Sequence, residues 1–205
     1  MTRDPNLAAV WGADTVEEAR ETYDRWAQTY EAENLAKGMR QPFIAAALLA
    51  RHMPADGPIL DAACGTGLVG EMLSVLGFSG LVGCDISAKM RTGAARFGVY
   101  DTLRDANLAA LPFEDDTFAG FACVGAFGPG HAPPRSLHEL CRVTKPGGVG
   151  VFTLREDTFR EQGFVPVMDD LAGTKWTLLE EAGPARTYLI GEPQLFTRYF
   201  AVKIL

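Results

Sequence analysis

Ile59-Leu60-Asp61-Ala62-Ala63-Cys64-Gly65-Thr66-Gly67 is a short apolar run that ends in a glycine turn. The run predicts a buried strand, and the apolar residues that follow predict a helix. With Gly70 the turn completes a G-x-G-x-x-G pattern, and Asp85 ends the next apolar run, 18 residues beyond Gly67. A strand, a glycine turn, a helix and a later acidic residue are typical of a nucleotide-binding βαβ unit.

Strand-like and helical segments alternate on the C-terminal side of this turn. We expect strands at 59–63, 81–85, 103–104, 118–126 and 149–154, helices at 68–76, 88–97 and 135–142, and a turn at 146–148. This alternation predicts parallel strands joined by helical crossovers. A helix at 165–172 precedes two further strands, 176–179 and 196–204, with no clear helix between them. The sequence thus predicts an α/β fold: a Rossmann-like, doubly wound, mostly parallel seven-stranded sheet with an antiparallel edge hairpin near the C-terminus.

Two helices are expected before the glycine turn. The first covers 14–35, where Thr15 and Glu18 fit a capping box, and Tyr23, Trp26 and Tyr30 recur at helical spacing. The second covers 42–52. We therefore expect a single domain over residues 1–205, with a helical lid at 1–54 and a Rossmann-like core at 55–205.

Composition narrows the class of protein. The chain has 205 residues, a net charge of −7 and no basic stripe, which argues against a nucleic-acid partner. It has no apolar run long enough to span a membrane, and residues 1–5 lack the pattern of a signal peptide, so we expect a cytoplasmic protein without membrane contact. The four cysteines form no CxxC pair and no metal-ligand cluster stands out, so no metal is expected.

The glycine turn alone fits two kinds of cofactor. A nicotinamide dinucleotide would place its pyrophosphate at the helix N-terminus, where the carboxylate of Asp61 would repel it. S-adenosylmethionine instead carries a sulfonium and an ammonium, which a nearby carboxylate favours. Asp85 would hydrogen-bond the ribose in either case. The alternatives are that Asp61 only braces the turn and that Asp85 only caps the following helix.

An ordered set of motifs resembles class I S-adenosylmethionine-dependent methyltransferases. The glycine turn resembles their first motif, and Gly83-Cys84-Asp85-Ile86-Ser87 their acidic second motif. Arg104-Asp105-Ala106-Asn107 resembles the adenine loop, and the segment 139–148 resembles the turn before strand five. The helix around 23–30 resembles the lid of small-molecule methyltransferases. Together these segments are similar to the methyltransferase-like group named after the Williams–Beuren syndrome region.

The resemblance and the charge argument imply a set of cofactor-binding residues. In Asp105 we expect an acceptor for the adenine amino group, and in Tyr23 and Tyr30 aromatic faces over the sulfonium, unless both rings simply pack in a core. Arg40 would pair with the cofactor carboxylate, unless it is a solvated surface residue. The full expected set is Tyr23, Tyr30, Arg40, Asp61, Ala63, Gly65, Thr66, Gly67, Asp85, Ile86, Met90, Asp105, Ala106, Val124 and Gly125.

The methyl acceptor is less well defined by the sequence. With no basic patch, a small molecule is favoured, contacted by the loop 127–134 and the segment 155–167. His131 is the histidine best placed to act as a general base, unless it is a loop residue with no chemistry, and no catalytic residue is assigned. Two alternatives stay open: a Rossmann-type nicotinamide-dependent oxidoreductase, and a non-catalytic protein that binds S-adenosylmethionine.

Overall fold

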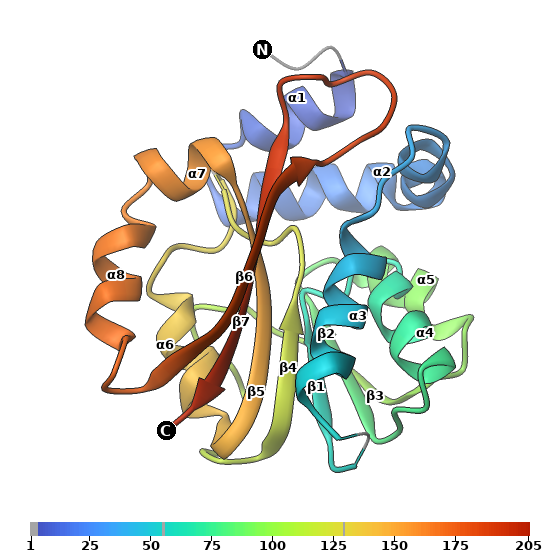
Figure 1. Cartoon of the computed structure of the whole chain (residues 1–205). Helices are drawn as coiled ribbons and strands as arrows, with labels where there is room; N and C mark the ends of the chain where they lie inside the picture. The colour runs from blue at the N-terminus through green and yellow to red at the C-terminus, as the bar shows by residue number, and fades with distance from the viewer. Residues whose placement is uncertain (1–3, 55, 129) are drawn as a thin grey trace.

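One seven-stranded sheet organises the molecule, in a computed structural model that describes residues 4–54, 56–128 and 130–205 (Figure 1). The strand order is β3-β2-β1-β4-β5-β7-β6. The strands are β1 (Ile59–Ala62), β2 (Leu81–Asp85), β3 (Tyr100–Asp105), β4 (Phe118–Cys123), β5 (Thr144–Arg155), β6 (Trp176–Arg186) and β7 (Phe196–Ile204). The first five are parallel, and β7 pairs antiparallel with both β5 and β6. The predicted fold class, edge hairpin included, is confirmed.

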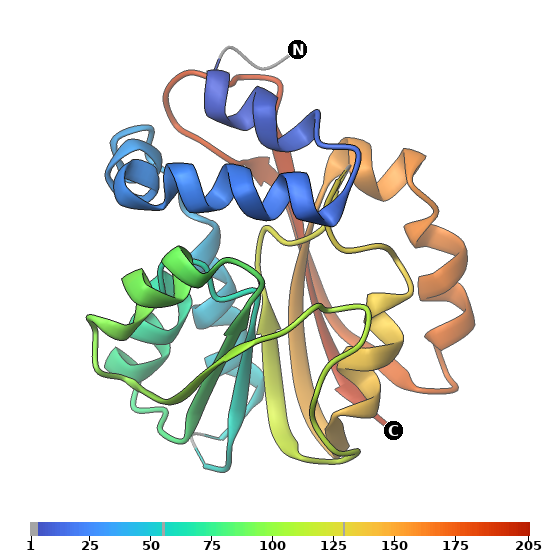
Figure 2. The same cartoon turned by 180° about the vertical axis from the view of Figure 1, so that it is seen from behind.

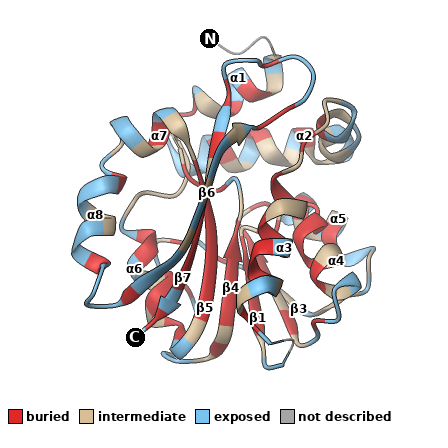
Figure 3. Cartoon of the chain, viewed as in Figure 1, coloured by how far each residue is buried: buried red, intermediate tan, exposed pale blue. Residues whose placement is uncertain are grey.

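Alternate strand residues face opposite sides of the sheet and meet different helices. Leu60 and Phe121 belong to the apolar cluster under α6 (Ser136–Arg142) and α8 (Phe164–Leu171). Their neighbours Ile59 and Ala122 belong to the cluster under α3 (Gln41–His52) and α4 (Leu68–Val75). The central strands are therefore buried on both faces, as Figure 3 shows. α5 (Ala88–Ala95) lies beside β2 and β3, and α7 (Glu156–Glu161) follows β5.

The N-terminal segment lies across one end of the sheet. α1 (Pro5–Trp11) and α2 (Val16–Ala36) cross the top of the molecule in Figure 2. α2 begins with the predicted capping box: the Thr15 side chain accepts from the Glu18 amide at 3.2 Å, and the Glu18 carboxylate accepts from the Thr15 amide at 3.3 Å. The long α2 therefore closes the end of the sheet where the strand order reverses between β1 and β4, which is where ligands bind in this class of fold.

Several predicted boundaries were wrong. β5 begins at Thr144, so Pro146–Gly148 is not a turn but an irregular stretch of strand, where the register with β4 shifts. β4 ends at Cys123 rather than residue 126, and β3 and β6 are longer than expected. β3 and β6 form the two edges of the sheet, so they expose polar residues and lack the continuous apolar run that marks a buried strand. Pro129, within the loop expected to contact the acceptor, and residues 1–3 and 55 lie outside the described residues.

Candidate functional site

A cavity opens at the carboxyl ends of β1, β2 and β4, beneath α2. We call it the main cavity; it contains about 730 Å³ of space with its open mouth included. The structure brings ten of the expected residues together in its wall: Tyr23, Tyr30, Ala63, Gly65, Asp85, Ile86, Met90, Ala106, Val124 and Gly125. Thr66 lines a smaller hollow that shares Gly65 and Gly125 with the main cavity.

The two glycines of the turn have different roles. Gly65 has a φ of +54°, and a Cβ built on it would meet no atom within 4 Å. Because Gly65 lines the main cavity, that open space is where a ligand can approach the backbone. Gly67 has a φ of +93°, and its Cβ would lie 2.9 Å from Ala94 Cα. Gly67 therefore allows α4 and α5 to pack closely, and it is not among the residues that line the cavity.

Asp85 lies at the end of β2 with its carboxylate in the cavity wall. Its Oδ2 accepts from the Gly65 amide at 2.9 Å and its Oδ1 from the Ser87 amide at 2.8 Å. Burial raises the pKa of Asp85 above its ordinary value. Each carboxylate oxygen has a second lone pair, so both can still accept from a ligand hydroxyl. The helix cap of α5 is Ser87, whose side chain accepts from the Met90 amide, and not Asp85.

Asp61 lies behind the turn and does not line the main cavity. Its side chain is 1% exposed, and its Oδ2 accepts from the Tyr100 hydroxyl at 2.5 Å. Burial raises the pKa of Asp61 to about 7, while hydrogen bonds from Tyr100 and the Gly70 backbone act in the opposite direction. This placement matches the bracing role better than a direct contact with a cationic cofactor.

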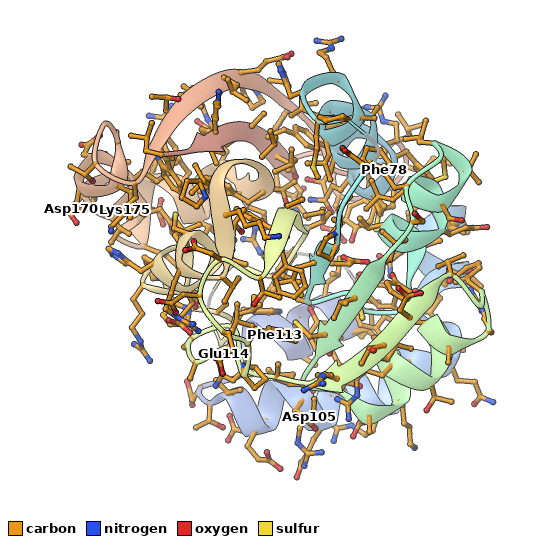
Figure 4. All side chains as sticks on the ribbon, turned by 90° about the horizontal axis from the view of Figure 1, so that it is seen from below. Phe78, Asp105, Phe113, Glu114, Asp170 and Lys175 are labelled. Atoms are coloured by element: carbon orange, nitrogen blue, oxygen red, sulfur yellow. The ribbon has the colours of Figure 1, made fainter. Side chains whose placement is uncertain are left out.

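Asp105 and Arg40 also lie outside the main cavity. Asp105 pairs with Arg91 at 3.1 Å, and its side chain is 72% exposed. It lies at the end of β3, before the loop that carries Phe113 and Glu114 (Figure 4). The next residues, Ala106, Asn107 and Leu108, line the cavity in its place. Arg40 precedes α3 and is half-buried, and its Nε is buried without a hydrogen bond to any described residue.

Aromatic rings of α2 form the roof of the site. Tyr23 meets Tyr30 edge to face, with centroids 6.2 Å apart, and both line the main cavity. The Tyr23 hydroxyl lies 2.8 Å from His131 Nε2. Burial raises the pKa of Tyr23 well above its ordinary value and that of Tyr30 to about 12, so both rings stay neutral. Trp26 belongs to an apolar cluster with Leu7 and Val10 of α1.

A second cavity adjoins the main one. This inner chamber shares Tyr23, Tyr30, Gly125 and His131 with the main cavity. Its other lining residues are Leu7, Trp11, Trp26, Gln41, Phe127, Thr153, Arg155, Thr187 and Tyr188. Phe127, His131 and Arg155 come from the two segments expected to contact the acceptor.

Other lining residues were not found from the sequence. Trp11 lies on α1, a short helix that gave no periodic signal, and Tyr188 lies in the connection between β6 and β7. Asn107 is the last residue of the adenine-loop motif and Leu108 follows it, so extending the expected contacts by two residues beyond Ala106 would have found both.

Two kinds of feature are absent from the described residues. None of the helices in 4–54, 56–128 and 130–205 is both long and apolar enough to cross a membrane. Over the same residues, no three His, Cys, Asp or Glu side chains are grouped so as to hold a metal ion.

Much of the chain is similar in sequence to known methyltransferases. Residues 60–152 match the family model described as "Methyltransferase domain". Over 143 residues the chain is 38% identical to human Methyltransferase-like protein 27, covering 66% of this chain and 57% of that protein. It is 33% identical over 139 residues to a Demethylmenaquinone methyltransferase of Symbiobacterium thermophilum, covering 63% and 55% respectively. The chain thus spans little more than half the length of these relatives.

The fold comparison agrees with the sequence match. The structure of the [4+2]-cyclase SpnF superposes with a TM-score of 0.71 at 15% identity, covering 93% of this chain and 97% of that one, which supports the fold alone. The family match begins within β1 and ends within β5. Residues 60–152 are therefore similar to a methyltransferase domain, and the glycine turn and Asp85 both lie within the match.

Proposed function

We propose that this chain is an S-adenosylmethionine-dependent methyltransferase that acts on a small molecule. The observation that carries the proposal is the pairing of Gly65 with Asp85 at the point where the strand order reverses. Gly65 leaves open space beside the backbone, and its amide donates to the Asp85 carboxylate at 2.9 Å. The space beside Gly65 lets a ligand approach the protein backbone, and the Asp85 carboxylate can accept hydrogen bonds from ligand hydroxyls.

The residues of the main cavity fit the parts of S-adenosylmethionine. We expect Asp85 to accept from the ribose hydroxyls, and Ile86 and Met90 to pack on the adenine. Tyr23 and Tyr30 lie across the cavity from the turn, on α2, where their faces suit a sulfonium. Asp61, behind the turn, would act by fixing the turn and the start of α4. For Asp105 and Arg40 the geometry gives no such support.

A small-molecule acceptor is supported by the shape and charge of the site. The inner chamber is covered by α1 and α2 and joins the main cavity at Tyr23, Tyr30, Gly125 and His131. The chain carries a net charge of −7, which disfavours a phosphate backbone as partner. The name of the Symbiobacterium relative also points to a small acceptor. The identity to human Methyltransferase-like protein 27 supports the narrower placement in the methyltransferase-like group.

The bound cofactor supplies a methyl group that is already activated, so the protein chiefly has to position the acceptor in line with it. An acceptor that carries a proton also needs a base. The Tyr23 hydroxyl lies 2.8 Å from His131 Nε2 at the junction of the two cavities. A neutral imidazole has one nitrogen that can take up a further proton. We propose that this pair takes up the proton of a hydroxyl acceptor.

Calorimetric titration with S-adenosylhomocysteine and, in parallel, with NADH tests the cofactor assignment. We expect S-adenosylhomocysteine to bind and NADH not to bind. Binding of NADH alone would instead support a nicotinamide-dependent oxidoreductase. Binding of S-adenosylhomocysteine without methyl transfer from labelled S-adenosylmethionine to a broad acceptor panel would support a non-catalytic binding protein.

A further inference from the structure

The wall of the inner chamber is unusually aromatic. Six Trp, Tyr and Phe side chains line it: Trp11, Tyr23, Trp26, Tyr30, Phe127 and Tyr188. They come from α1, α2, the loop after β4 and the connection between β6 and β7, so the chamber exists only because these elements meet. Stacking and edge contacts on such walls favour a flat aromatic ligand over a flexible aliphatic one.

One guanidinium is built into this aromatic wall. Arg155, the last residue of β5, lies over the ring of Trp11 at 3.8 Å from the centroid. Its Nε and Nη2 are both held by Asp157, the first at 3.0 Å. Its Nη1 is buried and makes no hydrogen bond to any described residue. A buried charged donor without a partner is costly, so a ligand oxygen at Nη1 would gain a strong interaction.

The charges around the chamber favour an anion. Among the described residues that line it, Arg155 is the sole Arg or Lys, and none is Asp or Glu. The partner Asp157 lines an outer hollow with Glu156 and Arg160, and this hollow adjoins the chamber at Trp11 and Arg155. A sulfonium held in the main cavity would add a second positive charge at the other end.

We propose that the inner chamber binds a planar aromatic acceptor that carries a carboxylate. The carboxylate accepts from Arg155 Nη1, the ring lies among the aromatic side chains, and the methyl-accepting group faces Tyr23 and His131. This inference rests on the proposed function, since the chamber is an acceptor site only if the main cavity holds S-adenosylmethionine.

The test is a binding comparison in the presence of saturating S-adenosylhomocysteine. The probes are 4-hydroxybenzoate, 6-hydroxy-2-naphthoate and the amide of each, which keep the ring and hydroxyl but remove the charge. Adipate controls for a carboxylate without a ring. We expect at least one aryl carboxylate to bind tenfold or more tightly than its amide, and adipate not to bind.

Two variants locate the preference. Arg155→Met should reduce the ratio between carboxylate and amide to below about threefold, and Arg155→Lys should restore part of it. Arg160→Met is the matched control, because Arg160 is exposed and lines the outer hollow but not the inner chamber. Affinity for S-adenosylhomocysteine should stay within about twofold of wild type in all three.

The outcomes separate the two proposals. Loss of S-adenosylhomocysteine binding in the wild-type protein contradicts the proposed function. If S-adenosylhomocysteine binds, then no aryl carboxylate binding, equal affinity for carboxylate and amide, or a preference that survives in Arg155→Met contradicts the chamber assignment. The wild-type comparison decides the charge preference even if Arg155→Met fails to fold.

Discussion

At the residue scale, two buried aspartates lie near the glycine turn but face different surroundings. Burial raises the pKa of both Asp61 and Asp85. Asp85 faces the main cavity and is held by two backbone amides, whereas Asp61 faces Tyr100 behind the turn. The sequence places both beside the turn, but the direction of each carboxyl depends on its own strand, β1 for Asp61 and β2 for Asp85, and on the Tyr100 ring from β3.

Asp85→Ala should weaken binding of S-adenosylhomocysteine by more than tenfold, because charge-assisted hydrogen bonds to the ribose are lost, on the order of 1.4 kcal/mol or more. Calorimetric titration measures the change. Asp105→Ala is the control, since the Asp105 side chain is 72% exposed and lies outside the cavity. Similar losses in both variants would mean that the ribose is not held by Asp85.

Substitution of the two turn glycines by alanine should have different effects on cofactor binding and on stability. Gly65→Ala adds a Cβ into the open space of the cavity at a left-handed φ, so we expect weaker cofactor binding and a modest cost in stability of about 1 kcal/mol. Gly67→Ala drives a Cβ against the backbone of Ala94, so we expect a larger fall in the free energy of unfolding. Titration and urea unfolding separate the two effects. Equal stability losses would argue that Gly65, too, is a packing residue.

At the element scale, the sequence predicted what was periodic and buried. β1, β2 and β7 and the long α2 were located within two residues, because each has a continuous apolar run or a helical spacing with a cap. α1 and α7 were missed, since six or seven residues give too few turns for a periodic pattern. The inner chamber was missed for a related reason: it is formed by α1 and the β6–β7 connection, which meet only in the folded chain.

An acidic side chain near the middle of the lid helix α2, Asp24, attaches this helix to the core at the start of α5. Asp24 Oδ1 accepts from the Ser87 hydroxyl at 2.5 Å and from the Lys89 amide at 3.2 Å, at the start of α5. Ser87 in turn donates its amide to Asp85. The position of α2 over the main cavity is thus coupled to the carboxylate expected to hold the ribose.

Asp24→Ala should loosen the lid without unfolding the core. We expect faster amide hydrogen exchange over residues 16–36 and a several-fold faster dissociation of S-adenosylhomocysteine, because two hydrogen bonds between α2 and α5 are lost. Glu21→Ala, at an exposed position of the same helix, should change neither. Uniformly faster exchange across the sheet would show that Asp24 supports the whole fold.

At the scale of the whole molecule, the central sheet encloses an ionisable group that most folds would exclude. Asp61 lies on β1, between β2 and β4, and its carboxyl is almost completely buried. The nearby Asp85 raises its pKa further, and no Arg or Lys is among the causes that shift it. The fold therefore favours the neutral form of Asp61, and stability should depend on pH.

The sign of this dependence follows from the raised pKa. The pKa of Asp61 is about 7 in the folded chain against 3.8 ordinarily, so between these values the folded state binds more protons than the unfolded state. The stabilisation is fully present below pH 3.8, declines as the pH rises, and is lost above about pH 7. Asp61→Asn keeps an acceptor for the Tyr100 hydroxyl and removes the titration. Its free energy of unfolding, measured by urea at pH 5 to 8, should rise relative to wild type by up to about 1.4 kcal/mol per pH unit. Asp105→Asn, which also removes one carboxyl, serves as the control for the change in net charge. Parallel curves for wild type and Asp61→Asn would show that Asp61 is ionised in the folded chain, which would restore it as a charged partner for the cofactor.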